Sequence, residues 1–237
     1  MWTANLDPAS KDRKAAAMRV RIPKRISPRA AIDLQQKLAP LVKERSELPQ
    51  KVTALVGCDA SYVLGTTLAA AVLVDYDDLH AKRIKSVKER TRFPYIPGLL
   101  AFREAPAVLR AIRSLKGSSY VCLVDGHGLA HPRKFGLACF VGLALDRPTI
   151  GVAKSLLYGS VEGTQVLDTE GHPIAELITL PSNGRTVYVS VGNKISLKDA
   201  VGIVRHCLTP RGPAPIALAH EEVTKRKWEI KKSSQAS

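Results

Sequence analysis

Val121-Cys-Leu-Val-Asp-Gly-His-Gly-Leu-Ala-His-Pro-Arg133 is the segment that says most about the fold and chemistry of this 237-residue chain. Its short apolar run is typical of a buried strand and ends at Asp125. Two glycines and two histidines follow within six residues, and glycine lets the backbone turn sharply and approach a ligand closely. Many sites hold a divalent cation with a carboxylate at the end of an apolar strand, so the segment predicts a metal site at a sheet edge.

The residues before and after this segment predict a mixed sheet. Residues 52–58, 67–74 and 82–90 have the patterns of three hairpin-connected strands. Helical and strand patterns alternate afterwards. The other expected elements are helices over 28–46, 105–115 with Pro106 in its first turn, 134–145 and from the cap Ser196 onward, and strands over 120–124, 149–153 and 187–191. Hairpins followed by crossovers predict a single α/β domain with helices on both faces of a mixed sheet.

Basic segments flank this domain. The sequence predicts a basic mobile tail over residues 1–27, a central domain over 28–223 and a basic C-terminal tail over 224–237. The chain has 36 Lys and Arg residues against 21 Asp and Glu residues, a net charge of +15. Because such a charge attracts polyanions, nucleic acid is the first partner to consider.

Several protein classes are disfavoured by what the sequence lacks. It contains no apolar run of 18 residues, which disfavours a membrane span. Its basic N-terminus has no apolar core of a secretory signal, so we expect a cytoplasmic protein without a membrane segment. The four cysteines form no C-x-x-C pair and mostly lie in apolar runs, which predicts reduced, structural thiols; they are Cys58, Cys122, Cys139 and Cys207.

Three acids occupy comparable settings. Asp59 follows an apolar strand pattern, Asp125 ends another, and Glu104 lies near the start of a helix. Each acid alone is better explained as a capping or salt-bridging residue. Strand ends on one edge of a sheet converge, however, and hard cations such as Mg²⁺ prefer oxygen ligands. The three together therefore predict a metal site.

The histidines and the lysine near these acids can each be interpreted in two ways. No cysteine or third histidine has the spacing that a zinc site with His127 and His131 would need. A histidine that positions water near a phosphate fits a nuclease better, although a hydrogen bond that orients the loop explains His127 equally well. Lys154 follows an apolar strand, where it is either a phosphate-binding group or an ordinary surface lysine.

The segment Phe93-Pro-Tyr-Ile-Pro-Gly98 cannot form a helix, because proline lacks a donor and restricts the residue before it. A rigid loop that presents Tyr95 suits a wedge that stacks on bases or separates strands. A packed proline-rich turn is the simpler reading of the segment alone.

Taken together, these stretches resemble the endonuclease V family, the inosine-directed nucleases with a ribonuclease H-like fold. The segments that carry the resemblance are Val-Gly-Cys-Asp59-Ala-Ser, Pro94-Tyr-Ile-Pro-Gly-Leu-Leu-Ala-Phe-Arg-Glu104, Val-Asp125-Gly-His-Gly-Leu-Ala-His131-Pro-Arg and Pro148-Thr-Ile-Gly-Val-Ala-Lys154. Their order and spacing also match, and the resemblance extends from about residue 29 to about residue 223.

The resemblance implies a monomeric endonuclease that uses Mg²⁺, or Mn²⁺ in its place. The expected substrate is DNA containing deoxyinosine, or RNA containing inosine. The enzyme would cut the second phosphodiester bond 3′ to the altered base, leaving 3′-hydroxyl and 5′-phosphate ends, as a step of DNA repair.

The resemblance also assigns residues to roles. The implied metal-binding and catalytic acids are Asp59, Glu104 and Asp125, with His131 and Lys154 acting near the phosphate. The implied substrate-binding residues are Pro94, Tyr95, Ile96 and Pro97 in the wedge, with Gly98, Leu100, Gly126 and His127 around the flipped base.

Two other functions remain open at this point. A non-catalytic nucleic-acid-binding protein on the same fold would explain the charge, but clustered carboxylates without a metal repel a phosphate backbone. Another ribonuclease H-like nuclease, one that cuts junctions or RNA–DNA hybrids, would explain the acids but not the loop around Tyr95.

Overall fold

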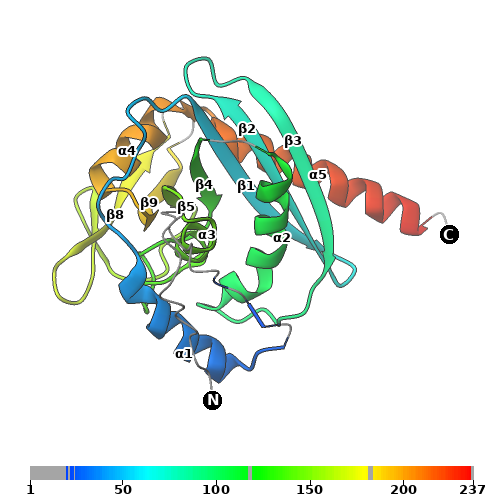
Figure 1. Ribbon diagram of the computed structural model, residues 1–237, viewed down its shortest axis with the longest axis horizontal. Coiled ribbons are helices and arrows are strands. Elements are labelled where there is room, and N and C mark those ends of the chain that lie inside the picture. The colour runs from blue at the N-terminus through cyan, green and yellow to red at the C-terminus, as the bar shows by residue number, and fades with distance from the viewer. Residues whose placement is uncertain (1–19, 21, 24, 117–118, 181–183, 236–237) are drawn as a thin grey trace, which may run out of the picture.

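Nine strands of the described residues form one mixed sheet at the centre of the molecule (Figure 1). The computed structural model describes residues 20, 22–23, 25–116, 119–180 and 184–235. The strands, in spatial order, are β3 (Ala81–Arg90), β2 (Thr66–Asp75), β1 (Ala54–Val63), β4 (Val121–Asp125), β5 (Thr149–Ala153), β9 (Thr186–Asn193), β8 (Pro173–Thr179), β7 (Gln165–Leu167) and β6 (Ser160–Glu162). A separate small hairpin joins β10 (Leu208–Thr209) to β11 (Gly212–Pro213).

The register places β1 at the junction of two pairing patterns. On one side β1 pairs antiparallel with β2, which pairs antiparallel with β3, so the expected meander is confirmed. On the other side β1 pairs parallel with β4, and β4 pairs parallel with β5. The neighbouring strands β1 and β4 thus bring Asp59 and Asp125 to one edge of the sheet.

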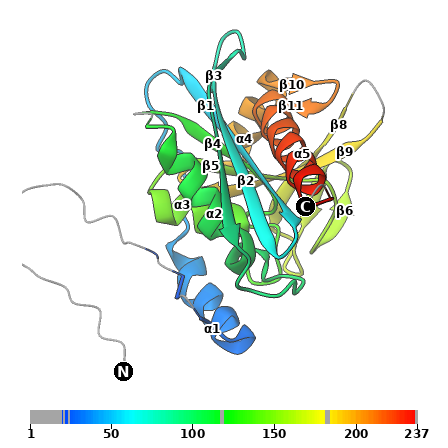
Figure 2. The same cartoon turned by 90° about the vertical axis from the view of Figure 1, so that its right-hand side faces the viewer.

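Five α-helices of the described residues surround the sheet; they are α1 (Pro28–Leu38), α2 (Leu100–Ser114), α3 (Leu137–Leu145), α4 (Leu197–His206) and α5 (Ala214–Gln235). A short 3₁₀ turn, Ala39–Leu41, continues α1. In β1 Tyr62 hydrogen-bonds α2, whereas Asp59 hydrogen-bonds α5. Because residues an odd number apart in a strand point to opposite faces, α2 and α5 cover opposite faces of the sheet, as Figure 2 shows. The predicted α/β fold with helices on both faces is confirmed.

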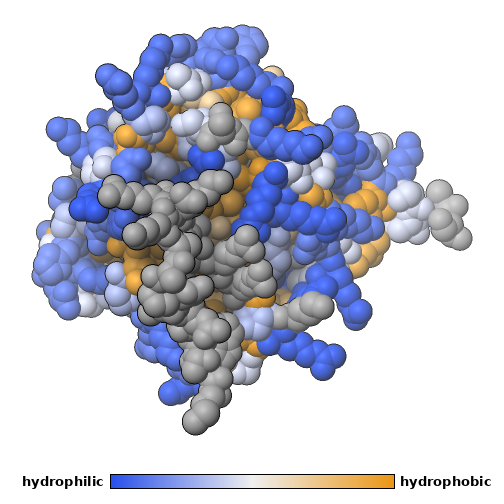
Figure 3. All heavy atoms as spheres, viewed as in Figure 1, coloured by the Kyte–Doolittle hydropathy of each residue, from blue (hydrophilic) through white to orange (hydrophobic). Residues whose placement is uncertain are grey.

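The core consists of apolar side chains from the inner strands and the covering helices. Phe102, Phe135 and Phe140 form edge-on ring contacts between α2, α3 and the loop before α3. Each of the four cysteines lies among the described residues, and each is buried and free. Hydrophilic side chains cover much of the visible described surface, with apolar areas between them (Figure 3). In the described part of the chain, no helix combines the length and the apolar character that crossing a membrane requires.

Three element boundaries differ clearly from the prediction. The first helix, expected over 28–46, ends at Leu38 and continues only as the turn Ala39–Leu41. β1 does not end before Asp59 but continues to Val63, because Leu64 and Gly65, both with positive φ, form a tight turn into β2. Asp59 therefore lies inside the strand, paired with Ala70. Helix α2 begins at Leu100 rather than at Ala105, so Pro106 lies in its second turn and not in its first.

Both predicted tails also need correction where they are described. Residues 224–235 do not form a separate tail but continue helix α5, whose Val223 and Ile230 pack against the sheet. Val20, Ile22 and Ile26 pack against the core, so the end of the predicted N-terminal tail belongs to the domain. The predicted mobility of residues 1–19 lies outside the described residues.

Candidate active site

Two of the three predicted acids meet at the edge where β1 and β4 run side by side. Cys58 of β1 pairs with Val124 of β4, so Asp59 and Asp125 follow at adjacent positions. Within the described residues, a carboxylate oxygen of each lies within 4.8 Å of the other and of a ring nitrogen of His220. Two carboxylates and one imidazole at this separation suit a divalent cation that takes oxygen and nitrogen ligands.

His220 reaches this edge from α5. Its Nδ1 lies 2.7 Å from Asp59 Oδ2, and the other Asp59 oxygen accepts a 2.7 Å hydrogen bond from the Ala60 amide. Gly57 permits the approach, because a Cβ there would lie 2.1 Å from the Pro215 carbonyl at the start of α5. A larger residue at 57 would hold α5 away from β1 and withdraw His220 from Asp59.

Glu104 lies beside this pair but outside the 4.8 Å group. It projects from α2 and accepts a 2.5 Å hydrogen bond from the Tyr62 hydroxyl. The Arg103 guanidinium lies 4.0 Å from the centre of the Tyr62 ring and holds that ring in place. Burial, followed by the nearby charges of Asp59 and Asp125, raises the pKa of Glu104 to about 8 despite the Tyr62 hydrogen bond.

Lys154 is the nearest cation to the acids. Lys154 directly follows β5, and its Nζ lies 2.6 Å from Asp125 Oδ2. Burial and the neighbouring Asp59 nevertheless raise the pKa of Asp125 to about 6. Although burial opposes it, contact with Asp125 raises the pKa of Lys154. Burial is the largest cause of both raised carboxyl pKa values, and the neighbouring carboxylates add to it. Three acids face the single lysine Lys154 at this cavity wall, so the residues fit a divalent cation in both charge and donor type.

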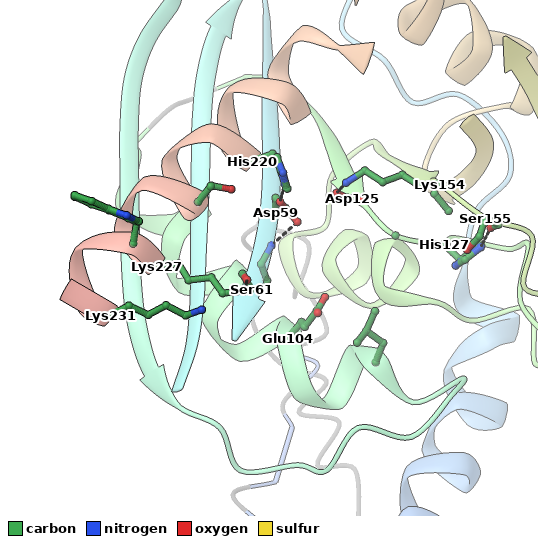
Figure 4. A pocket seen from close by; sticks show the side chains of 16 residues that line it. Asp59, Ser61, Glu104, Asp125, His127, Lys154, Ser155, His220, Lys227 and Lys231 are labelled. Atoms are coloured by element: carbon green, nitrogen blue, oxygen red, sulfur yellow. Dashed lines mark hydrogen bonds and ion pairs between the residues drawn. The ribbon is translucent and has the colours of Figure 1, made fainter. Parts of the chain in front are cut away.

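The acids open into a cavity of about 630 Å³. In Figure 4 His220 points from α5 toward Asp59, Lys154 toward Asp125, and Glu104 faces the same space from α2. The residues of α5 that line the rest of the cavity are Thr224, Lys227, Trp228 and Lys231. Gly126 and His127, to which the family resemblance gave a place in the substrate site, also line this cavity.

A second cavity, of about 210 Å³, adjoins the first behind the proline-rich loop. It shares Leu100, His127 and Ser155 with the larger cavity. It is lined by the predicted substrate residues Tyr95, Ile96, Pro97, Gly98, Leu100 and His127, and also by His131. Tyr95 is 69% exposed, and Pro94 is also exposed, so the loop presents its tip to solvent.

Three side chains hold the loop through one carbonyl. Gly98 O accepts hydrogen bonds from His131 Nε2 at 2.9 Å, Arg133 Nη2 at 2.7 Å and Gln35 Nε2 at 3.0 Å. Gln35 also donates to Phe135 O at 2.8 Å and accepts from Arg133 Nε at 2.7 Å. Gly98 has a φ of +77°, which a residue with a side chain rarely adopts.

His131 therefore lies with this loop and not among the acids. Its Nε2 is bound to Gly98 O, and its Nδ1 accepts a 3.1 Å hydrogen bond from the Arg133 amide. Burial lowers its pKa to about 4, so the ring is neutral near pH 7. The structure places His131 at the Gly98 loop, and its predicted role near the phosphate stays a prediction. His127 differs, because it borders both cavities and bonds Ser155 O at 2.9 Å, while burial lowers its pKa.

Sequence reasoning missed several residues of these sites. His220, Thr224, Lys227 and Lys231 recur at intervals of four, three and four residues, the spacing of one helix face. Gln35 is a single polar residue on the apolar face of α1, where Ala31 and Leu38 are also buried. Both signals were present in the sequence, but neither names a partner, so only the fold relates them to the acids.

Comparison with known proteins yields one family. The sequence profile of the endonuclease V family matches residues 36–221. An endonuclease V from Desulfurococcus amylolyticus is 43% identical over 176 residues, 72% of this chain and 80% of that relative. The structure of endonuclease V from Streptomyces avermitilis superposes with a TM-score of 0.80 at 32% identity, covering 90% of this chain and 99% of that one.

A further solved structure contains nucleic acid. Endonuclease V of Ciona intestinalis, in complex with a 24mer DNA containing an inosine followed by a ribo-adenosine, superposes with a TM-score of 0.76 at 27% identity. The superposition covers 84% of this chain and 96% of that one. The matched range 36–221 contains the three acids, Lys154, His220 and the loop at Gly98. On the extent of this match, the chain belongs to the endonuclease V family.

Proposed function

We propose that the protein is a metal-dependent endonuclease that recognises deoxyinosine in DNA, or inosine in RNA. It hydrolyses the second phosphodiester bond 3′ to the altered base and leaves 3′-hydroxyl and 5′-phosphate ends, as a step of DNA repair. The observation that carries the proposal is the meeting of Asp59, Asp125 and His220 beside a small cavity closed by the Gly98 loop.

The acidic residues would hold Mg²⁺ or Mn²⁺. Asp59, Asp125 and Glu104 supply oxygen ligands, and His220 supplies a ring nitrogen beside Asp59. When bound, such a cation lowers the pKa of a coordinated water and neutralises charge on the phosphate. The Tyr62 hydroxyl orients Glu104, and the Ala60 amide orients Asp59, so both carboxylates are positioned before substrate arrives.

Lys154 has two tasks in this proposal. Its contact with Asp125 favours the ionised carboxylate, and its position at the cavity lets it face a non-bridging phosphate oxygen. His131 positions the Gly98 loop rather than acting on the phosphate, because both of its ring nitrogens are engaged there.

The altered base would enter the smaller cavity. Flipping a base from a duplex costs a few kcal/mol, and least where pairing is weak, as at a mispaired hypoxanthine. The exposed Tyr95 would stack in the space that the flipped base leaves. The two cavities share the wall of Leu100, His127 and Ser155, which supports a substrate whose adjacent phosphates would lie over the acids.

The test is cleavage of matched oligonucleotides that carry one deoxyinosine, one inosine in RNA, or neither, each with Mg²⁺ and with chelator. We expect metal-dependent cutting one nucleotide beyond the altered base, with the relative rates ranking DNA against RNA. Binding without cutting in Mg²⁺ or Mn²⁺ would instead favour a non-catalytic nucleic-acid-binding protein. Equal cutting of unmodified strands would leave a nuclease but remove its inosine specificity.

A further inference from the structure

Helix α5 continues beyond the part of the chain that the family profile matches. The match ends at residue 221, but α5 runs to Gln235. Three residues in this outer part, Lys227, Trp228 and Lys231, line the same cavity as the acids. The similarity to the family profile assigns them no role.

The outer part of α5 is held in a fixed orientation. Val223 and Ile230 pack with Leu68 of β2 and neighbouring apolar residues of the sheet. Ser86 Oγ of β3 donates a 3.1 Å hydrogen bond to Glu222 on the same side. Because the helix is seated through these residues, Lys227 and Lys231 face the cavity, as Figure 4 shows.

The lysines on this face lack acidic partners among the residues that the structure describes. Lys227 Nζ donates a 3.1 Å hydrogen bond to Ser61 Oγ, a neutral group next to the acids. Across the described residues, neither Lys227 nor Lys231 has a carboxylate within 4.0 Å, whereas Arg226 pairs with both Glu222 and Glu229. The cavity thus has acids at one end and, at the other, two lysines that no described carboxylate pairs with.

Trp228 adds an aromatic ring to this face. It is 62% exposed, and Lys232 Nζ lies 5.2 Å from the centre of its ring. A tryptophan ring between lysines is the combination with which proteins bind single strands, since bases stack on the ring and phosphates pair with the cations.

We propose that the outer turns of α5 bind the substrate strand beside the cleavage site. Lys227 and Lys231 contact its phosphates, and Trp228 stacks on one of its bases. The inference rests on the proposed nuclease function, and it gives a physical reason for the lysines. The acids that hold a cation repel a polyanion, and cations across the same cavity offset that repulsion.

The first test is the salt dependence of binding, measured by fluorescence anisotropy with a deoxyinosine-containing single strand in chelator, so that nothing is cut. Each phosphate contact on a single strand contributes about 0.7 to the slope of log K against log salt. We expect Lys227→Gln with Lys231→Gln to reduce that slope by about 1.4 and to weaken binding roughly tenfold near 0.1 M salt.

A matched control removes the same charge elsewhere. Lys225 lies on an exposed face of α5 and Lys85 on the exposed strand β3, and neither lines the cavity. The double variant Lys225→Gln with Lys85→Gln should retain most of the slope. An unchanged slope in the Lys227 and Lys231 variant, or an equal loss in the control, would overturn the proposal.

The second test reads Trp228 directly. The chain has two tryptophans, so Trp2→Phe leaves Trp228 as the sole tryptophan reporter. We expect its fluorescence to be quenched when the single strand is added in chelator, with a midpoint that matches the anisotropy. Binding without any change in this fluorescence would remove the stacking role.

These measurements separate the two proposals. If wild-type protein fails to cut inosine-containing strands in Mg²⁺ yet the slope and quenching behave as expected, the nuclease proposal fails, and with it the place of α5 beside a cleavage site. Strand binding by α5 would then stand alone. If wild-type protein cuts and the variants bind as wild type does, the α5 inference fails alone.

Discussion

The acidic edge and the Gly98 loop are neighbouring regions with opposite electrostatic character. At the edge, Asp59, Glu104 and Asp125 bring like charges together, and burial raises the pKa values of two of them. In the loop, one carbonyl is satisfied three times, and His131 is neutral. The acids of the edge can hold a cation, whereas the polar groups of the loop already satisfy one another.

This difference distinguishes the acids, which are the residues proposed to act in the reaction, from the residues of the Gly98 loop, which fix the shape of the site. Removing a charge from the edge should relieve repulsion and cost activity, while removing a partner from the loop should cost stability first. A buried polar group left without its partner costs about 1–3 kcal/mol, which fixes the expected scale for the loop.

The largest effect is expected at Asp125. Asp125→Asn should lower cleavage of a deoxyinosine strand about 10³-fold or more, because the amide is a poorer ligand and leaves Lys154 without its anionic partner. The melting temperature should stay the same or rise, since one repelled charge is gone. Single-turnover cleavage and thermal unfolding measure the two results. Glu176→Gln, a carboxylate on β8 paired with Arg205, is the control. Cleavage within tenfold of wild type would contradict the assignment.

Gln35→Ala should weaken the anchoring of the Gly98 loop and thereby destabilise the protein. It removes contacts to Gly98 O, Phe135 O and Arg133 Nε at a fully buried position, at a cost of about 3 kcal/mol. Denaturant unfolding measures that cost. The adjacent Gln36 is exposed, so Gln36→Ala should change stability by less than about 0.5 kcal/mol. Equal effects of the two substitutions would show that the loop is not anchored through Gln35.

Tyr95→Ala should affect selectivity without affecting stability. The side chain is 69% exposed, so unfolding should be unchanged. Loss of a stacking ring is expected to lower the preference for deoxyinosine over undamaged DNA about tenfold, with a smaller change in total binding. Tyr95→Phe keeps the ring and should keep the preference. An unchanged preference in the alanine variant would refute the wedge role.

The last prediction tests the acidic edge through the pH dependence of the protein's stability. The pKa of Glu104 is raised from 4.5 to about 8, so its contribution to stability is fully present below about pH 4.5 and is lost as pH rises through 8. In chelator, the melting temperature should therefore decline by several degrees between pH 5 and 8. Glu104→Gln should flatten this decline, and Mg²⁺ should stabilise wild type more at pH 8 than at pH 5. An equal decline in the variant would place its cause elsewhere.

Local patterns predicted most of the sheet and the positions of the acids. The three-strand meander, strand β4 and the Ser196 cap of α4 follow from periodicity and turn residues within short windows. The acids follow from the same logic, because parallel neighbours bring their ends to one edge. The end of β1 could not be predicted from such patterns, because a Leu-Gly turn with two positive φ values is a weak signal in sequence.

Two features depend on the three-dimensional arrangement of the chain and could not be predicted from local sequence patterns. α5 is polar around much of its outer part, so its sequence carries no stripe that would predict which face meets the sheet. His131 lies only six residues after Asp125, yet tight turns carry it away from the acids, with the His131 amide bonded to Leu129 O at 2.6 Å. Proximity in sequence was therefore a poor guide to proximity in space.

The pairing of Asp59 with His220 joins residues 161 positions apart. During synthesis, the ribosome releases the acids of β1 and β4 long before it releases α5. Until α5 has emerged, the growing chain lacks the fourth group of the site and the cavity wall that carries Lys227. The order of translation keeps the cutting site unfinished until most of the protein has emerged.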